Sequence, residues 1–344
     1  MKKTVAIYDR DHNYARRLAE TLSRRENSDF AGISFTTPER LMEYERNHPI
    51  DMILVHETAL SSAESAACPV VVGLSEERDR EAAEPGESRI YKYQSADRLV
   101  RELSAAYCTA HPARPVPAGD AETRIWGLCS VFPGLPVSCL GMALAESLAE
   151  KGSTLYLRLG RDRGLFSCLG LEESEKDISD VFYYCRQREL DRIRLQSLTV
   201  RWRGADFIRP FAFPEDLEGR SGQEAGEVLE SLRRCGYERI VCEIGPEFPV
   251  LQPILQQCDR ILLLSGTDSL SRSCAEKEKE RLSAQETSFG EKLFLRELPE
   301  TDGQTDADRL RQAIGHGVWH QRAAELIGEE ETTWRKSMSS CCSD

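Results

Sequence analysis

Short apolar runs alternate with amphipathic stretches along the first 107 residues. Strands are expected at Thr4–Tyr8, Ala31–Phe35, Met52–Val55, Val70–Leu74 and Arg89–Tyr91. Helices are expected between and after them, at Asn13–Arg25, Pro38–Asn47 and Ala96–Tyr107. In the first helix Tyr14, Leu18 and Leu22 recur every four residues, which puts them on one face. Repeated strand–helix order predicts an α/β domain with a doubly wound parallel sheet.

A second series of the same kind begins after residue 120. Its expected strands are Ile125–Val131, Thr154–Leu159, Phe207–Ile208, Arg239–Ile244, Arg260–Leu264 and Lys292–Leu295. Its expected helices are Ser138–Lys151, Asp177–Cys185, Gln187–Leu195, Ser221–Cys235, Ser269–Ala284 and Asp306–Ile327. The pattern predicts a second doubly wound domain.

Prolines separate the two series. Pro112, Pro115 and Pro117 fall within six residues and favour an extended spacer. We therefore expect a first domain at residues 1–108, a linker at 109–121, a second domain at 122–330 and a flexible polar tail at 331–344. The length of 344 residues suits two domains of about 150 residues each.

Composition narrows the functional classes. The net charge of −13 argues against a general nucleic-acid binder, because phosphate neutralisation needs surplus Lys and Arg. The twelve cysteines form no CxxC pair and no zinc pattern, which favours a reducing cytoplasm. His316 and His320 lie four residues apart without a third ligand, so no metal site is expected. We expect no signal peptide, because the N-terminus lacks a long apolar core, and no membrane span, because the longest apolar runs are of strand length.

Polar residues follow the expected strands of the first domain. Asp9 and Asp11 follow the first strand, His56 the third, Ser75 the fourth and Lys92 the fifth. In this order they resemble the phosphorylation site of two-component receiver domains, over about residues 3–107. The resemblance implies an acidic corner, a phosphoacceptor, a hydroxyl residue and a lysine at these places.

The departures from that pattern change the expected chemistry. An acyl phosphate needs a carboxylate nucleophile and a carboxylate-bound Mg²⁺, but His56 stands at the acceptor position and Arg10 replaces one acid. We therefore expect a phosphorylation-independent docking domain (a pseudoreceiver) in which Ser75 and Lys92 form a hydrogen-bonded strut. The alternatives are a phosphohistidine switch at His56, an ordinary surface histidine there, and helix N-caps at Asp9 and Asp11.

The segment Ile125–Leu140 has a strand, a glycine/proline loop and a helix start, which is the layout of a phosphate-binding loop without its lysine. With the following helix it resembles the deviant Walker A segment of the MinD/ParA family. Phe132 and Val137 occupy the two lysine positions, and Pro133 and Pro136 replace glycines, so that each removes an N–H group.

Later landmarks extend the resemblance over about residues 122–330. Arg158 stands where the family has acids, and Glu243 aligns with the Walker B-like acid. The resemblance implies a degenerate nucleotide site made of Gly134, Ser138, Cys139, Glu243 and Asp268. Charge placement is what catalyses phosphoryl transfer, so we expect no ATP hydrolysis, with residual ATP and Mg²⁺ binding as the alternative. An ordinary strand–helix turn is the third reading of the loop.

The apolar loop suggests a different use. Phe132, Leu135 and Val137 are expected to form a permanent contact surface for a second copy or another protein.

The domain pair resembles TadZ/CpaE-type proteins of tight-adherence (Flp) pilus assembly. Lys92–Leu99, Phe213–Leu217 and Leu229–Tyr237 look like the Gram-positive members. The resemblance implies a cytoplasmic homodimer that marks the assembly site, at a pole or on the inner face of the membrane. It would recruit the pilus secretion ATPase and other assembly proteins and meet the membrane only through partners. The alternatives are a weak ParA/MinD-type ATPase in positioning or partitioning, with a cation supplied by Lys151, Arg158, Arg161 or Arg163, and a signalling adaptor.

Overall fold

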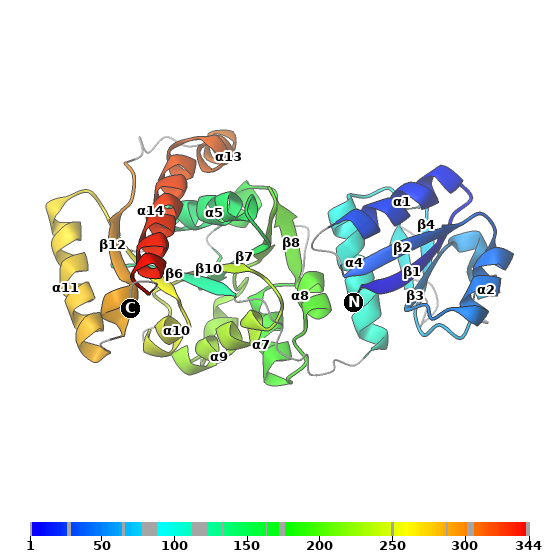
Figure 1. The fold of residues 1–344 in the computed structure, drawn as a ribbon, viewed down its shortest axis with the longest axis horizontal. Helices are drawn as coiled ribbons and strands as arrows, with labels where there is room; N and C mark the ends of the chain where they lie inside the picture. The colour runs from blue at the N-terminus through cyan, green and yellow to red at the C-terminus, as the bar shows by residue number, and fades with distance from the viewer. Residues whose placement is uncertain are drawn as a thin grey trace. The chain divides into compact units, whose positions relative to one another are not determined.

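A computed structural model describes residues 2–25, 29–63, 66–77, 88–111, 123–132, 134–162, 164–171, 176–248, 251–286, 288–300 and 306–341. The chain folds into two compact units (Figure 1). The first comprises Met1–Arg114 with Asp191–Ser197, and the second comprises Pro115–Leu190 with Leu198–Asp344. Most of the expected linker, residues 112–121, lies outside the described residues.

The sheet of the first unit is wholly parallel. Its order is β2-β1-β3-β4-β5. The strands are β1 (Lys3–Tyr8), β2 (Phe30–Phe35), β3 (Met52–His56), β4 (Val71–Ser75) and β5 (Ser88–Tyr91). The order reverses direction between β1 and β3, and side chains at the carboxyl ends of these strands meet at one edge, where doubly wound sheets bind ligands.

Helices cover both faces of this sheet. They are α1 (His12–Arg24), α2 (Pro38–Asn47), η1 (Glu57–Ala59), α3 (Leu60–Ala63) and α4 (Ala96–Ala110). One core joins α1 and α4 to the sheet, and the other joins α2 and α3 to the opposite face. Gly32 allows α1 to lie directly on β2, because a Cβ there would be 2.5 Å from Ala19 Cα.

The second unit has a seven-stranded sheet in the order β12-β11-β6-β10-β7-β9-β8. The pairs are parallel except the antiparallel β8–β9 pair. The strands are β6 (Arg124–Ser130), β7 (Thr154–Leu159), β8 (Thr199–Trp202), β9 (Ala205–Ile208), β10 (Arg239–Ile244), β11 (Arg260–Ser265) and β12 (Leu293–Glu297). Both units therefore confirm the predicted α/β class with parallel sheets.

Helix α5 (Leu135–Ala149) lies between this sheet and the last two helices (Figure 1). Most of its residues are buried, because it packs on β7 and β10 on one side and on α14 on the other. The other helices of this unit are α6 (Leu165–Cys168), α7 (Ile178–Arg186), η2 (Pro214–Leu217), α9 (Gly222–Arg233), α10 (Gln252–Gln256), α11 (Ser269–Gln285), α12 (Phe289–Lys292), α13 (Ala307–His316) and α14 (Val318–Cys341). Helix α8 (Arg192–Leu198) belongs to the first unit as far as Ser197.

The structure differs from several local predictions. No helix begins at Gln187: Arg188 has a positive φ of 58°, and α8 starts only at Arg192. Strand β8 was missed, although Arg203 and Gly204, with φ of 46° and 89°, make the two-residue turn that suits a β8–β9 hairpin.

The expected closing helix Asp306–Ile327 is two helices. Helix α13 ends before Gly317, where a Cβ would be 2.8 Å from Ala313 Cα. Helix α14 then continues to Cys341, so the expected flexible tail at 331–344 is helical over most of its length.

Candidate functional sites

The second unit places a buried cation beside the surviving residues of the degenerate loop. Glu243 in β10 and Arg158 in β7 are direct partners in the parallel register, so both side chains lie on the same face of the sheet. Ser138, in the first turns of α5, lies over that face. Tyr156 precedes Arg158 by two residues and therefore points the same way.

These four side chains form one network. The Arg158 guanidinium pairs with Glu243 Oε1, and its Nη1 lies 3.0 Å from Ser138 Oγ. Ser138 Oγ donates to Glu243 Oε1 at 3.0 Å, and the Tyr156 hydroxyl donates to Glu243 Oε2 at 2.6 Å. Arg158 Nε also donates to the carbonyl of Arg161 at 3.1 Å. Both carboxylate oxygens of Glu243 are thus engaged by donors of the same chain.

The network is closed to solvent. The most exposed of its four residues, Ser138, is 6% exposed. Burial raises the pKa of the Tyr156 hydroxyl, so this group stays a donor at neutral pH. Gly141 in α5 makes room for the ring, because a Cβ there would lie 2.9 Å from Tyr156 Cε2.

The loop before α5 and the first turn of the helix contain both exposed and buried residues. Phe132 and Leu135 are 51% and 44% exposed, whereas Val137 is 2% exposed and belongs to the core. The expectation that Val137 lines a contact surface is therefore wrong: the helix turns this side chain inward. Gly134 is the N-cap of α5 with an extended backbone, and Pro133 lies outside the described residues.

Two other expected site residues do not join the network. Cys139 is 1% exposed in the core, and burial raises the pKa of its thiol to about 12. Asp268 is the N-cap of α11, where it accepts a hydrogen bond from the Ser271 amide at 2.9 Å. Of the five predicted residues, Ser138 and Glu243 meet. Arg158 was expected only as a lost acid or as a cation for the alternative ATPase, not as the partner of Glu243, and Tyr156 was missed. The two-residue spacing of Tyr156 and Arg158 on a strand was the available signal.

These contacts do not fit a magnesium–nucleotide group. The degenerate nucleotide site implied by the MinD/ParA resemblance includes Ser138 and Glu243, but the Arg158 guanidinium contacts both. Pro136 in the first turn of α5 lacks an N–H group that could face phosphate. A metal would have to displace a buried, hydrogen-bonded cation.

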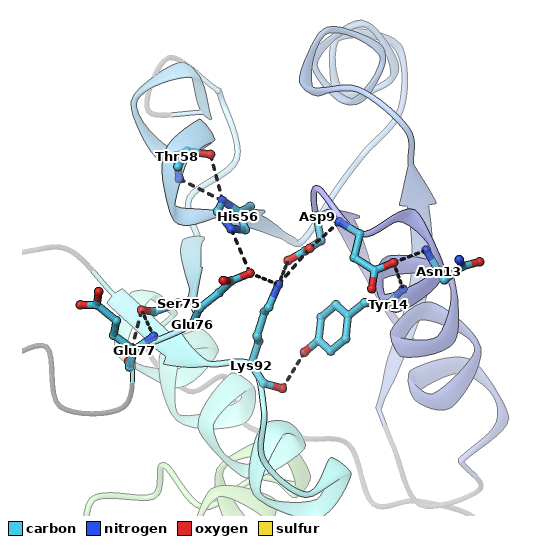
Figure 2. Close-up of polar contacts among 10 residues, drawn as sticks. Asp9, Asn13, Tyr14, His56, Thr58, Ser75, Glu76, Glu77 and Lys92 are labelled. Carbon is cyan, nitrogen blue, oxygen red and sulfur yellow. Dashed lines mark hydrogen bonds and ion pairs between the residues drawn. The ribbon is translucent and has the colours of Figure 1, made fainter.

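The first unit brings four polar side chains together at the carboxyl edge of its sheet. Lys92 Nζ lies 3.2 Å and 3.3 Å from the two oxygens of Asp9 and 2.7 Å from Glu76 Oε1 (Figure 2). His56 Nε2 lies 3.6 Å from the same Glu76 oxygen. Asp9, His56 and Lys92 were expected here. Glu76 was missed, because a carboxylate in a loop gives no periodic signal.

Ser75 and Asp11 have other roles. Ser75 Oγ bonds to the backbone of Glu77, with the amide donating at 3.2 Å, so the expected Ser75–Lys92 strut is not made by their side chains. Instead, the Lys92 amide donates to the Ser75 carbonyl at 2.9 Å. Asp11 caps α1 by accepting from the amides of Asn13 and Tyr14. The N-cap alternative is therefore confirmed for Asp11, while Asp9 pairs with Lys92.

Electrostatics favour the charged form of this cluster. Burial by itself lowers the pKa of Lys92, but hydrogen bonds to Glu76 and Asp9 outweigh it and raise the pKa. The hydrogen bond from Lys92 lowers the pKa of Glu76. Arg10, the cation expected to disturb the acidic corner, is exposed, and the cation that neutralises Asp9 is Lys92.

Comparisons with known proteins give structural matches alone. No family model matches the chain, and neither does any curated protein sequence. Among solved structures, a ParA family ATPase from Chlorobium tepidum is 15% identical with a TM-score of 0.43, over 56% of this chain and 81% of that one. A chain of the MinC:MinD cell division protein complex of Aquifex aeolicus is 16% identical with a TM-score of 0.41, over 51% of this chain and 68% of that one. MinD of Pyrococcus horikoshii, complexed with Mg-ADP, is 14% identical with a TM-score of 0.41, over 57% and 78%.

Among the helices of the described ranges, none combines the length and the apolar composition needed to cross a bilayer.

Proposed function

We propose that the chain is a nucleotide-independent docking protein with a MinD/ParA-like second unit, acting in Flp pilus assembly. The observation that carries the nucleotide-independent part is the Arg158 guanidinium held between Glu243 and Ser138. The pilus role rests on the sequence resemblance to TadZ/CpaE-type proteins.

The energetic cost of binding Mg·ATP supports this proposal. Mg²⁺ at Ser138 and Glu243 would leave Arg158 buried without its carboxylate. Removing one partner of a buried ion pair costs about 3–5 kcal/mol. At about 1.4 kcal/mol per factor of ten, that penalty weakens binding by roughly two to four orders of magnitude. A site with such a cost does not serve as a nucleotide switch.

In the absence of nucleotide binding, we assign protein docking to the surface around the start of α5. Phe132 and Leu135 are large, apolar and about half exposed at the start of α5. In this proposal they contact a second copy of the chain, and other surfaces bind the secretion ATPase and further assembly proteins. The protein would thus act in the cytoplasm, near a pole or at the membrane through these partners.

The nucleotide test is calorimetric titration of the full chain with ATP in the presence of Mg²⁺, with phosphate release measured on the same material. We expect no saturable heat at millimolar ATP and no phosphate release above buffer. Saturable binding with steady release would instead assign the chain to the alternative, a weak ParA/MinD-type ATPase, and would overturn the proposal.

The contact test uses F132D/L135D, with mass measured by light scattering. We expect the variant to lose a dimer that the unchanged chain forms. Val137 is not a useful target, because a buried aspartate would disrupt the core. Y183D is the matched control, since Tyr183 is an equally exposed aromatic residue (57%) on α7. A dimer that survives in F132D/L135D removes the homodimer part of the proposal.

The pilus role has its own test. Purified pilus secretion ATPase and other pilus-assembly proteins from the same organism would be assayed for direct binding. Binding by the unchanged chain without nucleotide is the expected result, and no binding to any pilus component argues against the assembly role.

A further inference from the structure

Two fixed donors in the first unit converge on one oxygen atom. Lys92 Nζ lies 2.7 Å from Glu76 Oε1, and His56 Nε2 lies 3.6 Å from it (Figure 2). The donors come from the carboxyl ends of β5 and β3, which flank β4 in the sheet. Glu76 directly follows β4. The oxygen of Glu76 therefore marks a place where the fold aims two N–H groups.

The histidine is held with its proton toward Glu76. The Thr58 amide donates to His56 Nδ1 at 3.3 Å, and Thr58 Oγ1 lies 2.9 Å from the same nitrogen. A ring nitrogen that accepts an amide hydrogen bond carries a lone pair, so the neutral ring has its N–H at Nε2. This ring nitrogen faces the carboxylate.

The lysine is held as firmly. Asp9 contacts its ammonium with both oxygens, and Asp9 is itself fixed by the Asp11 amide, which donates to Oδ1 at 2.8 Å. The Tyr14 hydroxyl donates to the Lys92 carbonyl at 2.9 Å. The rings of Tyr14 and Tyr93 lie 5.3 Å and 5.1 Å from Nζ, within the range of cation–π attraction.

Glu76, the carboxylate that Lys92 and His56 contact, is the exposed member of the cluster. The side chains of His56 and Lys92 are 3% and 2% exposed, whereas that of Glu76 is 50% exposed. An exposed carboxylate gains little net free energy from an ion pair, because water competes for it. The donors are thus preorganised, and Glu76 is the part that another acceptor can replace.

We propose that His56 and Lys92 form a carboxylate-binding site, which Glu76 of the same chain fills and from which a carboxylate of another molecule displaces it. The charge of the site selects this class. Asp9 already offsets the charge of Lys92, so a singly charged group like that of Glu76 suits the site better than a phosphate dianion. This inference concerns the first unit and is independent of the nucleotide question.

The experiment opens the site with E76A and follows the His56 ring and the Lys92 ammonium by ¹⁵N NMR. Sodium acetate is the probe, against sodium chloride at matched ionic strength. We expect a saturable shift in E76A with an affinity at least tenfold above that of the unchanged chain. E77A is the matched control, because the Glu77 contacts with Ser75 are made by its backbone. It should respond as the unchanged chain does.

A double variant, a folding control and a peptide probe distinguish the possible outcomes. H56A/E76A should lose most of the acetate affinity, since one of the two donors is gone. Circular dichroism checks that each variant folds, and E76S, whose side chain is too short to fill the site, replaces E76A if the latter does not. A Gly-Glu-Gly peptide that binds E76A more tightly than acetate points to a protein partner, and equal affinity points to a small acid.

Two results would overturn the proposal. The first is an acetate response that is linear, or the same in E76A, E77A and H56A/E76A. The second is tighter binding of inorganic phosphate than of acetate, because it would assign the site to a different ligand class.

Discussion

Both units pair an acid with a side-chain cation, but the two sites differ in how exposed they are to solvent. Each has an acid at the carboxyl edge of a parallel sheet, and each neutralises it with a side-chain cation: Lys92 for Asp9, and Arg158 for Glu243. In the second unit all members of the network are buried. In the first, Glu76 is half exposed. Complete burial thus leaves the second site with no exchangeable ligand, while the first keeps one in the half-exposed Glu76.

The largest effect is expected from a variant of the buried Arg158–Glu243 pair in the second unit. R158M leaves the Glu243 carboxylate buried without its cation, which should destabilise the second unit by about 3–5 kcal/mol. The readout is denaturant unfolding followed by tryptophan fluorescence, because all four tryptophans of the chain belong to the second unit.

R161M is its control. Arg161 is 54% exposed and lies 3.7 Å from Glu247, and such a surface pair contributes about 0–1 kcal/mol. The double variant R158M/E243Q should recover part of the loss, since it removes the unpaired charge. Equal unfolding midpoints for R158M and R161M would mean that the Arg158 pair is not what stabilises this edge of the sheet.

A smaller effect is expected from Y156F. The variant keeps the ring but removes the hydroxyl that donates to Glu243 Oε2 at 2.6 Å. A hydrogen bond to a buried charge contributes about 1.5–3 kcal/mol. The free energy of unfolding from the same denaturant curves should fall by that amount. Y183F, at an exposed position, should not shift them. A Y156F curve that overlays that of Y183F would show the carboxylate is satisfied without this donor.

The smallest effect should come from E76Q, and it should depend on pH. Lys92 lowers the pKa of Glu76 from the ordinary 4.5, so the contact adds stability above that pH and loses it as the pH falls through the lower folded value. The midpoint difference between the unchanged chain and E76Q should therefore be constant near neutral pH and shrink as the pH falls below 4.5 and through the lower pKa of the folded state.

Thermal unfolding of the first unit, followed by the amide NMR signals of β3 and β5, measures this difference. The NMR signals of Asp9, His56 and Lys92 must be followed too, since His56 and Lys92 face the Glu76 carboxylate and Asp9 pairs with Lys92. A midpoint difference that grows on acidification would contradict the ion pair between Lys92 and Glu76. It would also remove the distinction between the half-exposed site of the first unit and the buried site of the second.

The sequence by itself determined the two α/β units and most of their strands, because buried parallel strands are continuous apolar runs bounded by turns. It also placed Asp9, His56 and Lys92 together, since the carboxyl ends of adjacent parallel strands share one edge. The lack of lysine in the Ser130–Cys139 loop was visible without any coordinates.

Tertiary structure decided the rest. The pairing of Arg158 with Glu243 depends on the register between β7 and β10, whose residues are 85 positions apart in the sequence. The inward turn of Val137 depends on the phase with which α5 packs on the sheet. The position of the Glu76 carboxylate depends on Lys92 and His56, which two other strands bring close to this loop residue. These are non-local contacts, and local patterns of apolar and polar residues do not specify them.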